Sequence, residues 1–138
     1  MKFLTVPEVE YVAHRLAKML MTFNEPIPEF STRYPNVLEG CLAMPFQKFG
    51  GKSFYPSLAD KAAMLFYLMI KNHPFQNGNK RVAVTTLLYL LYRNGKWLEV
   101  DKQEFYNFAK WVAESNPKVK DQTVEAVKKF IKTYITKL

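Results

Sequence analysis

The nine residues HPFQNGNKR, at positions 73–81, combine a histidine, side-chain amides, a glycine and two adjacent cations. Histidine is the side chain best suited to proton transfer near neutral pH. Lys80 and Arg81 are anion-binding groups, and Gly78 allows the backbone to approach a ligand closely. This signature segment (residues 73–81) therefore predicts a site in which a base, His73, acts beside a bound anion.

The flanking sequence predicts that the signature segment connects two buried helices. AAMLFYLMI at 62–70 is wholly apolar, and VAVTTLLYLLY at 82–92 is apolar on most helical faces. A helix that begins near Asn79 presents backbone N–H groups and partial positive charge, which favour a bound anion. Cations in a first helical turn oppose the helix dipole. Lys80 and Arg81 would gain a role there if a polyphosphate binds.

Each of these residues also has a purely structural explanation. His73 would hydrogen-bond the end of its own helix, and Asn77 with Gly78 would form a common turn dipeptide. The two cations would be ordinary surface charges. Phe75 is expected to be a buried anchor that fixes the loop. Single residues do not separate these explanations, whereas their order and spacing favour a site.

Composition and charge restrict the classes of protein to consider. The chain of 138 residues, 49% hydrophobic, suits one folded domain over residues 1–138. Its net charge of +8 favours anionic partners such as nucleotides, nucleic acid or an acidic protein, although solubility alone also explains such a charge.

The cellular compartment can also be predicted from the sequence. The single cysteine, Cys41, excludes an internal disulfide and favours a reducing compartment. The N-terminal residues lack the pattern of a signal peptide, and no apolar run reaches the roughly 18 residues of a membrane span. We expect a cytoplasmic protein with no membrane association.

The remaining sequence predicts an all-α fold with one small flap. Capping residues predict helices that begin at Thr5, near Asn36, at Ser57 and at Asp101, and a basic helix over 121–137 closes the chain. QKFGGKSFYP, at 47–56, has no helical period, and its glycine pair predicts an exposed loop or a small β-hairpin. LEV at 98–100 is at most a short strand.

HPFQNGNKR resembles the signature of the Fic/Doc family, which runs His-x-Phe-x-Asp/Glu-Gly-Asn-Gly/Lys-Arg. Lys80, and Val84 where Fic enzymes usually carry a second arginine, favour the Doc (death-on-curing) branch. The stretch PNVLEGCLAMPFQKFGGKSFYPSLADKAAMLFYLMIKNHPF, at 35–75, also resembles the region that precedes this signature in Doc proteins. The resemblance covers residues 1 to about 115 and implies a Fic/Doc-type helical bundle.

This resemblance implies a transferase that uses ATP and Mg²⁺ to modify a hydroxyl of a target protein. Fic proteins usually adenylylate their targets (AMPylation), whereas the Doc toxin is a kinase that phosphorylates elongation factor Tu. By position, His73 would be the general base. The phosphates would be bound by Gly78, Asn79, Lys80 and Arg81.

The resemblance also implies two protein partners. A flap would pair with the target chain alongside the nucleotide, and a cognate antitoxin would place a helical tail in a groove of the toxin. The flap is predicted at Phe49, Gly50, Gly51, Lys52, Ser53 and Phe54.

Asn77 is the one departure from the family pattern. The family has an acidic residue there, which helps to hold Mg²⁺, whereas an amide oxygen ligates the ion without a charge. We expect weakened metal binding with retained activity. One alternative is a catalytically silent Fic-fold interaction protein. A second is a basic nucleic-acid-binding module, for which no recognition pattern accompanies the lysines of the tail helix.

Overall fold

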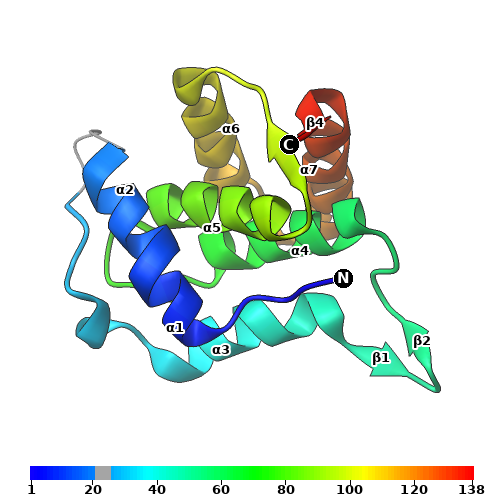
Figure 1. Ribbon diagram of the computed structural model, residues 1–138, viewed down its shortest axis with the longest axis horizontal. Coiled ribbons are helices and arrows are strands. Elements are labelled where there is room, and N and C mark those ends of the chain that lie inside the picture. Colours follow the sequence, from blue (N-terminus) through cyan, green and yellow to red (C-terminus); the bar gives the residue numbers. More distant parts are fainter. Residues whose placement is uncertain (21–25) are drawn as a thin grey trace.

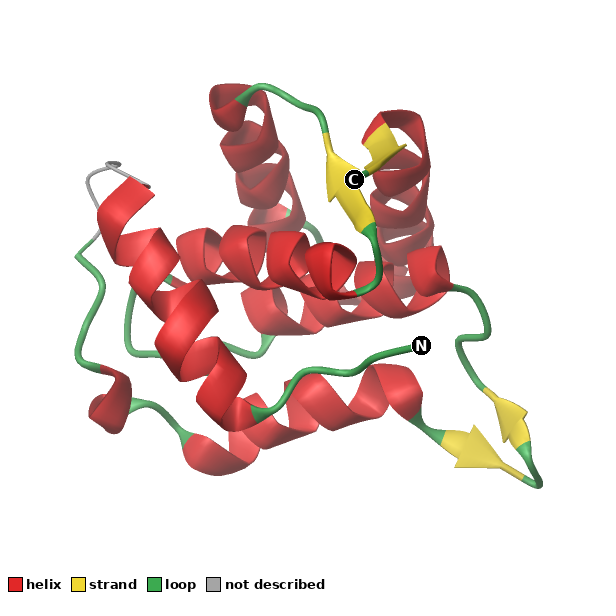
Figure 2. Cartoon of the chain, viewed as in Figure 1, coloured by secondary structure: helices red, strands yellow, loops and turns green. Residues whose placement is uncertain are grey.

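The computed structural model describes residues 1–20 and 26–138, which form a helical protein with two small sheets (Figures 1 and 2). The helices are α1 (Val6–Glu8), η1 (Val9–His14), α2 (Arg15–Leu20), η2 (Phe30–Thr32), α3 (Pro35–Ala43), η3 (Met44–Phe46), α4 (Leu58–Lys71), α5 (Asn79–Arg93), α6 (Lys102–Glu114), η4 (Pro117–Val119) and α7 (Lys120–Tyr134). The strands are β1 (Lys48–Phe49), β2 (Lys52–Ser53), β3 (Lys96–Leu98) and β4 (Ile135–Lys137).

Helices α4 and α5 form the centre of the molecule, as the sequence predicted. In α4 every residue from 61 to 70 is buried, and most of α5 is buried as well. Helices α6 and α7 pack on one side of this pair, α3 packs against α4, and η1 and α2 cross α5 (Figure 1). Within the described ranges, no helix is both long and apolar enough to cross a bilayer.

Local sequence signals set the predicted starts of three helices. Glu8 donates its backbone N–H to the Thr5 hydroxyl, and Asp60 donates its own to the Ser57 hydroxyl at 3.0 Å. In both pairs the carboxylate accepts the N–H of the capping residue in return, which completes a capping box. Asp101 accepts two N–H groups of the first turn of α6. These contacts confirm the predicted caps.

Other boundaries differ from the prediction. Helix α3 begins at Pro35, whose fixed φ suits a first helical position, so Asn36 is not its cap. The short strand lies at Lys96–Leu98 rather than at 98–100, and it pairs with β4, whose residues were predicted to be helical. Pairing between segments so distant in sequence leaves no local pattern, which is why β4 was not predicted.

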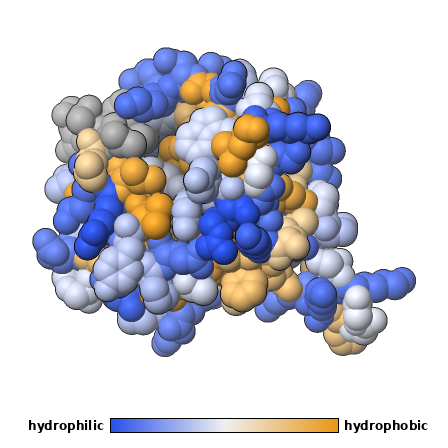
Figure 3. Space-filling model, viewed as in Figure 1, coloured by the Kyte–Doolittle hydropathy of each residue, from blue (hydrophilic) through white to orange (hydrophobic). Residues whose placement is uncertain are grey.

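The predicted hairpin is confirmed over residues 47–54. Lys48 lies opposite Ser53 and Phe49 lies opposite Lys52 in antiparallel register. Gly50 and Gly51 form the turn with φ of +59° and +79°, a combination that favours glycine. This hairpin projects from the body of the molecule, at the lower right of Figures 1 and 3.

Candidate functional site

His73 follows the end of α4 in an unusual backbone conformation. Its φ of +50° makes it the one non-glycine residue with a positive φ in the described part of the chain. A side chain in this region costs on the order of 1 kcal/mol, and such strain concentrates at functional sites. Its side chain is exposed, so a second molecule can reach the imidazole.

Asn79, the first residue of α5, closes the signature segment on itself. Its Oδ1 accepts the backbone N–H of Phe75 at 2.9 Å, and its Nδ2 donates to the carbonyl of Phe75 at 2.9 Å. The same Nδ2 lies 3.4 Å from Nδ1 of His73. The Asn79 side chain therefore braces the loop and contacts the histidine ring at the start of α5.

Phe75 fixes the signature segment to the protein core. Its buried ring lies 5.5 Å from the ring of His14 and 5.8 Å from that of Phe30, centroid to centroid. Next to it, the carbonyl of Pro74 accepts the backbone N–H of Tyr34 at 2.8 Å. The position of the loop is therefore set by two other parts of the chain, η1 and the residues before α3.

The covering segment (residues 26–34) lies directly against the start of α5. Gly78 has a φ of +72°, and a Cβ built there would lie 2.9 Å from Cγ1 of Ile27 and 3.3 Å from the carbonyl oxygen of Pro26. Glycine is thus required both by the backbone conformation and by the close packing. Sequence reasoning missed the covering segment, because its irregular backbone shows no periodic pattern.

His14 joins the covering segment to the helical body. Its Nε2 lies 3.1 Å from the carbonyl oxygen of Pro28, and its ring packs edge-on against Phe30. It lies in a π-helical stretch, a distortion that is frequent at functional sites. Burial lowers the pKa of His14 from its ordinary value, so the neutral ring is favoured in the folded protein.

The two predicted anion-binding cations stand in the first turn of α5. Lys80 is half-buried, whereas Arg81 is only 5% exposed. Burial removes the solvent that would compete for the N–H groups of Arg81, and it also limits how closely a second molecule can approach this guanidinium. The structure thus brings both cations to the helix N-terminus that His73 adjoins.

Asn77 provides a poor fit for a metal ion. Its Oδ1 accepts the backbone N–H of Gly78 at 2.8 Å, so one of the N–H groups predicted to face an anion is already bonded. Across residues 1–20 and 26–138, no three His, Cys, Asp or Glu side chains gather as a metal site. At the family's acidic position the chain therefore offers Mg²⁺ a neutral oxygen instead of a carboxylate, and the phosphates would have to supply other ligands.

The structure does not bring the predicted flap to the signature segment. The hairpin precedes the N-terminus of α4 and His73 follows its C-terminus, and the 14 residues of α4 span about 21 Å (Figure 1). The predicted residues of the signature segment lie together, and they are His73, Phe75, Asn77, Gly78, Asn79, Lys80 and Arg81. The predicted flap residues lie apart from them, and they are Phe49, Gly50, Gly51, Lys52, Ser53 and Phe54. The expected pairing of a target chain with the hairpin alongside the nucleotide has no support from this placement.

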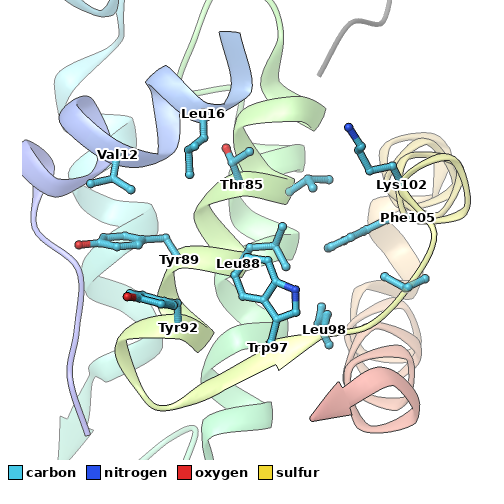
Figure 4. A pocket seen from close by; sticks show the side chains of 12 residues that line it. Val12, Leu16, Thr85, Leu88, Tyr89, Tyr92, Trp97, Leu98, Lys102 and Phe105 are labelled. Carbon is cyan, nitrogen blue, oxygen red and sulfur yellow. The ribbon is translucent and has the colours of Figure 1, made fainter. Parts of the chain in front are cut away.

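A separate apolar cavity of about 470 Å³ lies along the side of α5 (Figure 4). Helix α5 lines it from Val84 to Tyr92, and η1 and α2 contribute Val12 and Leu16. The remaining residues come from β3, the start of α6 and the connection between them. Lys102 carries the one ammonium group among its lining residues. The sequence did not predict this cavity.

Comparison with known proteins identifies related sequences. Residues 4–91 match the model of the Fic/DOC family. Toxin Doc of Mycolicibacterium smegmatis is 36% identical over 73 residues, which make up 53% of this chain and 56% of that protein. The chain thus spans little more than half the length of this curated relative. No solved structure shows significant similarity.

Proposed function

The chain belongs to the Fic/DOC family, and on that premise we propose that it is a Doc-like toxin. It would transfer a phosphate or a nucleotidyl group from ATP to a hydroxyl of a target protein. The observation that carries this proposal is the exposed imidazole of His73 beside the N-terminus of α5, held there by Asn79. A base next to an anion-binding helix start is the arrangement that such a transfer needs.

The proposed reaction begins when a ring nitrogen of His73 accepts the proton of the target hydroxyl. The oxygen then attacks a phosphorus atom of ATP. Attack at the γ position breaks the bond to the β–γ bridging oxygen and releases ADP, whereas attack at the α position releases pyrophosphate. The N-terminus of α5 with Lys80 and Arg81 would stabilise the charge on the phosphates.

Magnesium ion would neutralise part of the phosphate charge when it is bound with ATP. Asn77 is the residue of the signature segment that would face it, through a neutral oxygen that already accepts a hydrogen bond. We therefore assign no step of the reaction to the metal.

We propose that the target chain reaches His73 beside the covering segment rather than along the hairpin. Support comes from the contacts of this segment, since Ile27 packs on Gly78 and the Tyr34 N–H binds the Pro74 carbonyl. Elongation factor Tu is the candidate target that the resemblance suggests, which would place the reaction in the cytoplasm.

A cognate antitoxin is the second proposed partner. Its helical tail would place an apolar face in the cavity along α5, where Leu88 is a half-buried lining residue (Figure 4). Lys102 and the net charge of +8 favour acidic residues on the flanks of that helix. Leu88→Glu should abolish co-purification of a co-expressed antitoxin and leave transfer by the free toxin intact.

Transfer can be tested by incubating the protein and cell lysate with ATP labelled at the α or the γ position. Label from the γ position alone on one protein band identifies a phosphotransferase, and label from the α position identifies an adenylyltransferase. A labelled band at elongation factor Tu, reproduced with the purified factor, would identify the target.

Two results would replace this proposal by another. Absence of label from both positions, with His73→Ala arresting growth as the parent does, would indicate a catalytically silent interaction protein. Tight binding of duplex nucleic acid that weakens with salt and ignores ATP would instead indicate a nucleic-acid-binding module.

A further inference from the structure

Lys71, the last residue of α4, bonds to the end of α6. Lys71 is half-buried, and its ammonium group donates to the carbonyl oxygen of Ala113 at 3.1 Å and to that of Ser115 at 2.6 Å. The last carbonyl groups of a helix have no partner within the helix and carry partial negative charge, so they favour a cation. The contact therefore joins the end of α4 to the end of α6, which packs against it (Figure 1).

Helix α6 does not need this contact in order to end. Ser115 donates its backbone N–H to the carbonyl oxygen of Val112 at 3.1 Å, and its hydroxyl donates to the same oxygen at 2.5 Å. The backbone of Ser115 is already extended, which stops the helix. The bonds from Lys71 therefore do more than cap α6, because they also fix where the end of α4 lies relative to it.

This fixed point lies two residues before the histidine of the signature segment. Only Asn72 separates Lys71 from His73. On the other side of the histidine, the carbonyl of Pro74 accepts the backbone N–H of Tyr34 at 2.8 Å. The backbone of His73 thus has an anchor on each side, and each anchor bonds to a segment that is distant in sequence.

The backbone conformation of His73 depends on such anchors. A non-glycine residue with a φ of +50° is strained by on the order of 1 kcal/mol, and it keeps that conformation only where its surroundings impose it. If the end of α4 were released from α6, the backbone would relax toward a negative φ. The ring of His73 would then leave Nδ2 of Asn79, which lies 3.4 Å from its Nδ1.

We propose that Lys71 is a positioning residue for His73. By holding the end of α4 on the last carbonyl groups of α6, it keeps the imidazole at the N-terminus of α5. Lys71 would act through the backbone of Asn72 and not on a substrate. The expected effect on transfer rests on the proposed function, whereas the expected effect on the position of His73 is a property of the free protein.

Nuclear magnetic resonance of the free protein tests this position directly. The chain contains two histidines, so its imidazole C–H signals can be assigned by comparison with His73→Ala. Lys71→Met removes the ammonium group and keeps a side chain of similar length. It should move the His73 signal toward its position in the urea-unfolded chain and leave the signal of the buried His14 in place. Lys71→Arg, which retains a cationic donor, should keep the His73 signal of the parent.

Lys61→Met is the matched control for Lys71→Met. Lys61 lies at the opposite end of α4, and its ammonium group also donates to a backbone carbonyl, that of Tyr55. Its replacement should leave the His73 signal unchanged. Retained hydrogen-exchange protection of the α5 amides would verify that both methionine variants keep the fold.

The rate of label transfer from ATP measures the consequence for the reaction. Lys71→Met should lower kcat about tenfold or more with an unchanged KM for ATP, because the base is displaced while the phosphate site is kept. Lys71→Arg should restore most of the rate.

The proposal is overturned if the His73 signal of Lys71→Met coincides with that of the parent. It is also overturned if Lys61→Met moves this signal as far, or if Lys71→Arg moves it as far as Lys71→Met does. Absence of transfer by the parent would instead contradict the proposed function, and the resonance measurement would still decide the role of Lys71.

Discussion

Asn77 is the residue at which the signature segment departs from the family pattern, and it allows a gain-of-function test. Asn77→Asp introduces the negative charge that the family pattern has at this position, so Mg²⁺-dependent transfer should rise severalfold if the side chain there faces the metal, as proposed. Initial rates measured over a series of Mg²⁺ concentrations would show this. Gln76→Glu, the same change of charge at the exposed neighbouring amide, is the control. An equal rise in the transfer rate of both variants would mean that added negative charge, and not the position of Asn77, causes the increase.

His14 couples folding to pH through its burial. Burial lowers its folded-state pKa below the unfolded value of 6.5, so the unfolded chain binds more protons between the two values. The contribution of the neutral His14 ring to the free energy of unfolding is therefore fully present above pH 6.5. It is lost as the pH falls toward the folded-state pKa. The charged groups that act on it, Lys18, Glu29 and Glu10, modify the shift without reversing it.

The His14→Gln variant should show a flatter dependence of stability on pH. Urea unfolding at pH 7.5 and 5.5 should show that the parent loses more unfolding free energy than the variant on acidification, because burial lowers the pKa of His14 in the folded state. Equal losses in the two proteins would mean that His14 titrates normally in the folded state.

At the scale of elements, the packing of the covering segment on α5 depends on Gly78. Gly78→Ala forces a side chain into a left-handed conformation and places its Cβ 2.9 Å from Ile27. The variant should lose roughly 2–3 kcal/mol of unfolding free energy and most of its ATP binding, because the helix start must shift.

Gly95→Ala is the matched control for that change. Gly95 has a φ of +76° and no atom within 4 Å of a built Cβ, so this variant has only the backbone strain. Its loss should be near 1 kcal/mol, with ATP binding unchanged. Thermal and urea unfolding of both variants would separate strain from packing, and equal losses would show that the contact with Ile27 contributes nothing.

The starts of α1, α4, α5 and α6 could be predicted because their causes are local. A capping side chain and its partner lie within a few residues, as for Ser57 and Asp60, and continuous apolar sequence marks a buried helix. The signature segment was recognisable for the same reason, since its chemistry lies in consecutive residues. These features are independent of the rest of the fold.

Features of the whole molecule could not be predicted because they depend on contacts between distant segments. Strand β4 forms only by pairing with β3, and the covering segment is defined only by its contact with Gly78. The hairpin was predicted as an element, but its distance from His73 was not. That distance depends on α4, which has the hairpin before its first residue and His73 after its last. The residues of the candidate site could therefore be identified from the sequence. The segments that pack around that site could not.

The central claim is that His73 removes a proton from a target hydroxyl while ATP is held at the N-terminus of α5. The most direct test is the rate of label transfer from ATP to the target protein, compared between the parent and His73→Ala, with Gln76→Ala as an exposed control in the same segment. The rate should fall by about 10²–10⁴ in His73→Ala without loss of ATP binding, and it should be unchanged in Gln76→Ala. Equal transfer by His73→Ala and the parent would contradict the claim.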